Sequence, residues 1–415
     1  MAGGQGRAGR PSGSSGGRRH RAGRSWWNDR LWQAGFVVGS VLGAAATVAG
    51  RRAEAAARQG LVDWAAVERI AVGRLAAAPG RLPPEELRAA EGRYVEAVRR
   101  VGPALAERLG TELPDVVDRV SVVDRPGWVA VNIVAFRTLI SRIEGPLLEQ
   151  LLPPGAGLPK ATIALLNRWF TTRQLGYLLG FLGQRVLGQY DLALLSAETV
   201  PGRLLFVEEN VRATAQALGV AVDDFRVWIA LHETTHAFEF EAHPWLRPYL
   251  AERVEAQLVG FSREAPSLSR DALRALGRSL RGEADGSWVE RLMSPEQRRR
   301  FREVQAVMSV LEGFSDWIMD DLGPRLVPGG EAIGGRFHER RAQRTPLERA
   351  ILRLTGLDLK LEQYRMGERF VSAIVERAGP AAVARLWSGP EALPSLAEIE
   401  SPDRWLTRTM GEGAR

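Results

Sequence analysis

The chain has 415 residues, 45% of them hydrophobic and none of them cysteine. It can therefore bury one large core or two, while disulfides, thiolate metal sites and cysteine nucleophiles are excluded. The net charge of +7 is concentrated in residues 1–30, whose seven arginines and one aspartate account for six of the seven charges. The remaining chain is close to neutral, which argues against a face that binds nucleic acid.

The first 55 residues divide into a tail and an apolar segment. Residues 1–30 are rich in Gly, Arg and Ser and are expected to form a disordered basic tail. Residues 31–55 are expected to form an apolar helix, and the run 31–50 is just long enough to cross a bilayer. A membrane anchor, a signal peptide and a helix packed on the domain all fit this run. A cytoplasmic and a membrane-associated location in a bacterium therefore both stay open.

The following chain shows mainly helical spacing of its apolar residues. Helices are expected from Trp64 onward and again over residues 128–152, after a turn at residues 124–127. The clearest strand covers residues 203–207, and Asn210 is expected to cap the helix behind it. We therefore predict a mainly α fold with a small β-sheet.

The second half of the chain carries the strongest helix signals. One helix is expected to start near Asp223 or Asp224 and another at Ser294, where Ser, Pro and Gln occupy the positions of a capping box. The second helix is expected to end near Asp321, before a loop over residues 322–345. Residues 262–290 are expected to be helical too. Residues 56–415 are interpreted as one domain, with a helical part over 56–200 and the functional site within 201–415.

The motif that carries chemistry is His232-Glu233-Thr234-Thr235-His236. Residues four apart lie one turn apart on the same helix face, so His232 and His236 can bind one zinc ion. Glu233, beside the first histidine, can reach a water on that ion and take its proton. The apolar segment before the motif predicts the buried helix that this chemistry needs.

A catalytic zinc normally has three protein ligands and one open position, so a third ligand is needed. Glu312 is favoured because it lies in an otherwise apolar helix, with Asp316 one turn later on the same face. Asp316 is expected to accept the second ring N–H of a zinc-bound histidine and to hold its orientation. The rival is His243, but the third histidine of the metzincin pattern would stand at position 242, which is alanine.

With these motifs the chain resembles the thermolysin-type gluzincins, and more closely a family of zincin-like metallopeptidases of high-GC bacteria. Some of its members carry the description of a hydrolase associated with deazaflavin-coenzyme biosynthesis. The resemblance spans roughly residues 60–408 and implies a zincin fold with a zinc site, but no particular substrate. The stretches that carry it are Gly60–Trp64, Val123–Trp128, Phe206–Asn210, His232–Arg247, Glu312–Asp320 and Gly356–Gly367.

The predicted function is zinc-dependent hydrolysis of an amide bond in a peptide or a small amide. Tyr364 is the candidate that would stabilise the oxyanion of the intermediate, with Arg365 and His338 as alternatives. The strand over 203–207 is a candidate edge along which an extended peptide could pair. A zincin-like scaffold that binds a partner without cleaving it is the alternative function. Absence of a Gly-rich phosphate loop argues against a nucleotide enzyme, and the sequence does not predict the oligomeric state.

Overall fold

The computed structural model describes residues 51–112, 115–153, 157–191, 202–257, 259–260, 293–342 and 357–411. Within these ranges the chain is mainly helical, with one three-stranded sheet. The mainly α prediction is therefore confirmed. The basic tail, the apolar run 31–50 and the helix predicted over 262–290 lie outside the described residues.

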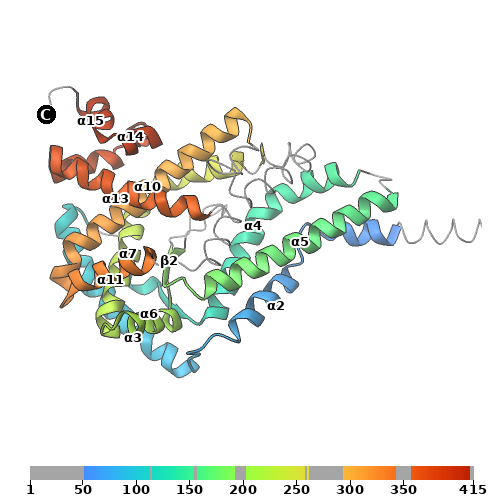
Figure 1. Cartoon of the computed structure of the whole chain (residues 1–415), viewed down its shortest axis with the longest axis horizontal. Helices are drawn as coiled ribbons and strands as arrows, with labels where there is room; N and C mark the ends of the chain where they lie inside the picture. The colour runs from blue at the N-terminus through green and yellow to red at the C-terminus, as the bar shows by residue number, and fades with distance from the viewer. Residues whose placement is uncertain are drawn as a thin grey trace, which may run out of the picture.

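The first half of the described chain contains four long helices and two of the strands (Figure 1). Residues 51–57 are helical as well, and they lead into α2. The elements in chain order are α2 (Trp64–Leu75), α3 (Pro84–Leu109), the 3-10 turn η1 (Val117–Arg119), β1 (Val120–Val123), α4 (Arg125–Leu151), α5 (Gly157–Gly183) and β2 (Gly188–Asp191).

The second half adds the third strand and the helices around it. Residues 246–257 form a helix between α7 and α10. The other elements are β3 (Arg203–Val207), α6 (Glu208–Leu218), α7 (Val222–Glu241), α10 (Pro295–Leu326), α11 (Gly330–Ala342), α13 (Leu357–Ala378), the 3-10 segments η2 (Pro380–Trp387) and η3 (Pro390–Ala392), α14 (Leu396–Glu400) and α15 (Pro402–Met410).

The sheet has the order β1-β3-β2, with β1 parallel and β2 antiparallel to β3. The strand predicted over residues 203–207 is thus present, but it is the central strand and not an edge. Its two partners are four residues long and were not predicted. Short strands without clear alternation leave little periodic signal in a sequence.

Strand β3 separates two hydrophobic cores because its side chains alternate between the two faces of the sheet. Leu204 and Phe206 pack into the larger core, which α3, α7, α10 and α13 surround. Leu205 and Val207 pack into a smaller core with α2, α4 and α5. Figure 1 shows α4 and α5 as a long pair that projects from the rest of the molecule, with α2 along α5.

Helix α7 is buried over most of its circumference, between α3, α10, β2 and β3. Its apolar residues Trp228, Ile229 and Leu231 all belong to the larger core. This burial explains the nearly continuous hydrophobic run ahead of the histidine motif. The helix is buried, as the sequence predicted, and within the motif Glu233 is buried while the two histidines are half-buried.

Helix α10 starts where its capping box predicts. The Ser294 hydroxyl accepts a hydrogen bond from the Gln297 N–H, and the Gln297 side chain accepts one from the Ser294 N–H. The predicted end near Asp321 is wrong, because the helix continues through Gly323 and Pro324 to Leu326. Gly323 lies against the ring of Trp228, so packing on α7 holds a segment that propensity alone would end.

Two further local predictions are wrong. Residues 330–342, expected within a loop, form α11, whose first glycine packs against the backbone at Gly323. Asn210 does not cap α6, which starts two residues earlier. Its buried side chain instead accepts from the guanidinium of Arg125 and donates to the carbonyls of Gly183 and Val186. Tertiary contacts override the local signal in both places.

Among the residues that the structure describes, none of the helices combines the length and apolar character that crossing a bilayer requires. The structure therefore gives the predicted membrane anchor no support, and the run 31–50 on which that prediction rested lies outside the described ranges.

Candidate metal centre

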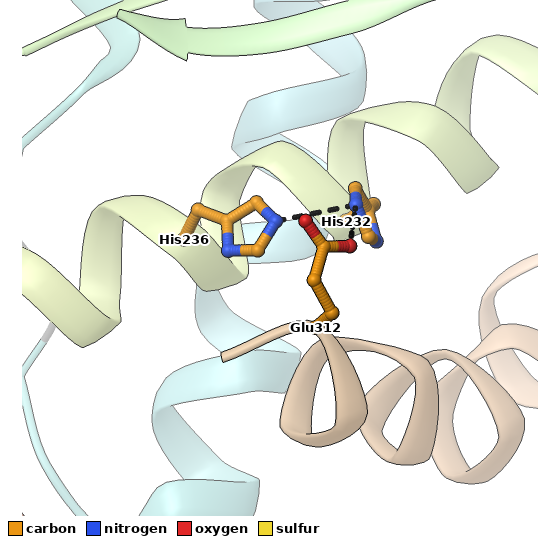
Figure 2. Close-up of side chains that lie close together, drawn as sticks. All are labelled: His232, His236 and Glu312. Carbon is orange, nitrogen blue, oxygen red and sulfur yellow. Dashed lines mark hydrogen bonds and ion pairs between the residues drawn. The ribbon is translucent and has the colours of Figure 1, made fainter. Parts of the chain in front are cut away.

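The two motif histidines and Glu312 come together from two helices (Figure 2). His232 and His236 lie one turn apart on α7, and their Nε2 atoms are 3.2 Å apart. Glu312 reaches them from α10, with its Oε2 3.8 Å from the Nε2 of His232. One ligand atom from each of the three side chains lies within 4.8 Å of the other two.

This arrangement suits a small divalent cation. Zinc binds imidazole nitrogen and carboxylate oxygen at about 2.0–2.2 Å, so neighbouring ligand atoms of a tetrahedral site lie about 3.3 Å apart. The separations of 3.2 and 3.8 Å lie close to that value. Two imidazoles and a carboxylate are also a donor set typical of catalytic zinc, with one position left open.

Glu233 lies beside the group, buried against strand β2. A side chain at Gly188 would overlap its carboxylate, since a Cβ there would stand 2.6 Å from Oε1. Glycine at this position therefore lets the carboxylate rest against the strand. Burial raises the pKa of the Glu233 carboxyl to about 7, and the nearby Glu312 adds to the rise, while His236 and the N–H of Tyr190 oppose it.

The comparison with protein families agrees with this geometry. The model of the family described as zincin-like metallopeptidases matches residues 62–406, most of the chain. The chain belongs to this family. The resemblance inferred from the motifs is thereby confirmed, together with the zincin-like fold. Membership assigns the chain to the hydrolases and implies a metal, which the His-His-Glu group could hold.

A solved structure is similar over the same region. It is the crystal structure of a protein from Chloroflexus aurantiacus that was assigned as a hydrolase and was described as having a novel fold. The two chains are 37% identical, with a TM-score of 0.62, over 85% of this chain and 100% of the other. The comparison with curated proteins finds no match.

Glu239 is a residue of this zincin that the sequence analysis did not assign to the site. It lies one turn beyond His236 on α7 and is fully buried. Its Oε2 is 2.7 Å from the Nδ1 of His236, the ring nitrogen that faces away from Glu312. Ser315 on α10 adds its hydroxyl 3.3 Å from the same nitrogen. The sequence feature that could have identified Glu239 is its position three residues after the second histidine on a helix expected to be buried, because a buried charge needs a partner.

The charges of the site oppose one another in a buried setting. Burial lowers the pKa of the His236 imidazole, but the carboxylates of Glu239, Glu312 and Glu233 outweigh it and raise the pKa to about 10. Burial also raises the pKa of Glu239 to about 7, against the effect of His236. Three carboxylates around two imidazoles thus favour a positive charge between them, as a cation would supply.

The other ring nitrogen of His232 contacts a sulfur. Its Nδ1 lies 3.2 Å from the Sδ of Met319, two turns beyond Glu312 on α10. Asp316, the predicted partner of a zinc-bound histidine, is buried on the same helix, one turn after Glu312. The contact to His236 Nδ1 comes from Glu239, so the role of Asp316 stays a prediction.

The rival ligand His243 lies apart from the His-His-Glu group. It stacks on Trp387 with ring centroids 5.0 Å apart, and its Nδ1 contacts the carbonyl of Glu239 at 2.9 Å. Burial lowers the pKa of its imidazole. His243 therefore packs between the aromatic side chains of Phe238 and Trp387, outside the His-His-Glu group.

The candidate oxyanion donors are only partly placed. Tyr364 and Arg365 belong to α13 and His338 to α11, but their side chains lie outside the described part of the structure. Helix α13 does approach the site closely: Gly367 meets Gly313 of α10, the residue after Glu312. The assignment of Tyr364 therefore stays a prediction.

Strand β2 runs beside the site, whereas β3, the predicted edge for peptide pairing, is the central strand of the described sheet. The pairing of β2 with β3 places the N–H of Gln189 toward β3 and that of Tyr190 on the opposite side. Consistent with this register, the N–H of Tyr190 is a hydrogen-bond donor to Glu233. The edge strand of the sheet therefore runs past the predicted general base.

Proposed function

We propose that this zincin is a zinc-dependent hydrolase that cleaves an amide bond, with peptides as its substrates. The observation that carries the proposal is the convergence of His232, His236 and Glu312 beside the buried carboxylate of Glu233. A core histidine pair or a solvated acidic face would not bring together three ligand atoms and an adjacent base.

The three side chains of the group would hold the zinc, and Glu239 would hold the ring of His236 through its Nδ1. Zinc bound there supplies a Lewis acid and makes water a competent nucleophile near neutral pH. The three side chains are half-buried and stand on two packed helices, so none of them depends on an exposed loop for its position.

Glu233 is the general base and acid of the proposed reaction. Its carboxylate takes a proton from the attacking water, and it then delivers that proton to the nitrogen of the leaving amine. A pKa raised toward 7 suits both halves of this exchange, because the group must accept and release a proton at the same pH. Tyr364 remains the proposed donor to the oxyanion.

An extended peptide is the proposed substrate because β2 is an edge of the three-stranded sheet that the described residues form, and it lies beside Glu233. The peptide groups of Gly188 and the carbonyl of Tyr190 point away from β3, on the side from which a substrate strand could pair, while the N–H of Tyr190 donates to Glu233. Backbone pairing would place an amide of the substrate near the base without requiring a particular side chain. A small amide would gain nothing from this edge.

Glu233→Gln tests the proposal by separating metal binding from turnover. We expect one zinc per chain in the purified wild type and in this variant, measured by mass spectrometry. Peptide cleavage, followed as new termini in a mixture of unstructured peptides, should fall by about 100-fold or more in the variant. Glu312→Ala should lose both zinc and cleavage, because only two ligands remain.

Glu252→Gln serves as the matched control, since this glutamate is exposed on the helix over 246–257 and is not one of the residues of the His-His-Glu group. It should keep both zinc and turnover. Cleavage that survives in zinc-loaded Glu233→Gln would refute the assignment of the base. A folded wild type that takes up no zinc when zinc is offered would refute the enzyme and favour the scaffold function.

A further inference from the structure

Helix α5 exposes an unusual number of large apolar side chains. Of the described residues, seven large hydrophobic side chains are exposed, and six of them belong to this helix. Single exposed hydrophobic residues are ordinary, but six on one helix form a continuous patch that normally marks a contact surface. The six, which we call the α5 face, are Leu158, Ile163, Leu166, Trp169, Phe170 and Tyr177.

The α5 face is a true helix face and not a scatter of side chains. Ile163, Leu166 and Phe170 are spaced by three and four residues and are 58%, 60% and 55% exposed. The opposite side of α5 is buried. There Gly176 lets the helix approach the side chain of Ile70 on α2, and Ala161 packs into a small core with the helix over 51–57. The α5 face therefore stays exposed although the other side of α5 packs against α2 and the helix over 51–57.

The charges of α5 are all positive. Its 27 residues include no aspartate or glutamate, and they carry Lys160, Arg168 and Arg173. The guanidinium of Arg173 lies 4.9 Å from the ring centre of Trp169, and that of Arg74 lies 5.1 Å from that of Tyr177. Cations beside exposed aromatic rings suit an anionic surface with an apolar interior. They disfavour a second copy of α5, which would bring like charges together.

The described chain begins at residue 51, beside the first turn of α5, where the carboxylate of Glu54 accepts the N–H of Gly157 at 2.8 Å. Residues 31–50 of the sequence, just before that point, are an apolar run, and arginines cluster over residues 18–24. The apolar run and the arginines therefore precede, in the sequence, the point at which the described chain meets α5.

We propose that the α5 face binds the surface of a lipid bilayer that contains anionic phospholipids. The helix lies in the plane of the interface, with its apolar side chains among the acyl chains and its cations at the headgroups. The projection of α4 and α5 from the rest of the molecule leaves this pair free to meet such a surface (Figure 1). This inference does not depend on the proposed hydrolase activity.

Vesicle sedimentation of the full chain tests the proposal. The probes are vesicles of phosphatidylcholine alone and vesicles that contain about 30% phosphatidylglycerol, a fraction chosen to supply anionic headgroups. Wild type should sediment with the anionic vesicles. The double variant Leu166→Ser/Phe170→Ser should bind them at least tenfold more weakly, because it removes two apolar side chains from the interface. Arg173→Gln should weaken binding about fivefold, and only to the anionic vesicles.

Val134→Ser is the matched control, since Val134 is 66% exposed but belongs to α4. It should leave vesicle binding unchanged. The variants alter exposed side chains and should keep the thermal unfolding midpoint of the wild type. All of them retain residues 1–50, so binding that is equal in wild type and the double variant would assign it to that segment and overturn the proposal. The proposal would also fail if the wild type sedimented with neither kind of vesicle. It would fail too if light scattering showed that the double variant only converts a dimer into a monomer.

Discussion

Single residues around the metal group show how burial decides their roles. Glu239 is buried, so water does not stabilise the charge of its carboxylate, which instead forms a hydrogen bond with the Nδ1 of His236. A carboxylate in that position fixes the ring orientation and leaves the opposite nitrogen for a metal. Glu233 is equally buried but lies on the side of β2, where it can serve as base.

Glu239→Gln should weaken zinc binding by about 10- to 100-fold, because an amide holds the histidine less strongly than a carboxylate. Competition with a chelator of known affinity measures this change. Asp316→Asn gives the comparison, since Asp316 was the residue that the sequence favoured for the role. A larger loss in Asp316→Asn than in Glu239→Gln would contradict the assignment of this role to Glu239 and would support the predicted role of Asp316.

At the scale of elements, the site depends on the crossing of α10 and α13. A Cβ on Gly367 would stand 1.9 Å from the carbonyl oxygen of Ser309, and one on Gly313 would stand 2.2 Å from the backbone of Gly367. The two helices therefore meet backbone to backbone, next to Glu312. Any side chain at this crossing must push α10 and α13 apart and move the third ligand.

Gly367→Ala should accordingly destabilise the protein by about 1–3 kcal/mol, the usual effect of overpacking, and should weaken zinc binding. Chemical unfolding and metal titration measure the two effects. Gly92→Ala, also within a helix, is the control, because nothing lies within 4 Å of a Cβ there. It should be neutral or stabilising by about 0.5–1 kcal/mol. Equal effects of both changes would contradict the close crossing.

At the scale of the whole molecule, the metal group joins segments that are distant in sequence. His236 and Glu312 belong to α7 and α10, which also pack together in the larger core. A cation that binds the folded arrangement and not the separated ligands must stabilise the fold by mass action. The size of the effect depends on free zinc relative to its dissociation constant.

Removal of zinc with a chelator should therefore lower the thermal unfolding midpoint of the wild type. At free zinc 100 times its dissociation constant, the expected stabilisation is about 2.7 kcal/mol. Differential scanning calorimetry with and without added zinc measures it. Glu312→Ala should unfold at the same temperature in both conditions. If the thermal unfolding midpoint of the wild type were the same with and without zinc, the His-His-Glu group would bind no ion in the native state.

The sequence by itself determined the features that arise from local periodicity and chemistry. The spacing of His232 and His236 places them on one helix face, and the capping box at Ser294 starts α10 where it predicts. The mainly α class follows from helical patterns that are long and repeated, which makes them robust to local exceptions. Glu312 was inferred because an acidic residue in an apolar helix needs a partner.

Tertiary structure alone decided the rest. Glu239 and Gly188 matter through what lies across from them, and no local pattern encodes that partner. The two short strands exist because β3 offers them backbone partners, and α10 passes Pro324 because Gly323 packs on Trp228. Packing between distant segments can outweigh local conformational propensities of about 1 kcal/mol per residue. Contacts between residues that are far apart in the sequence therefore cannot be predicted from local sequence patterns.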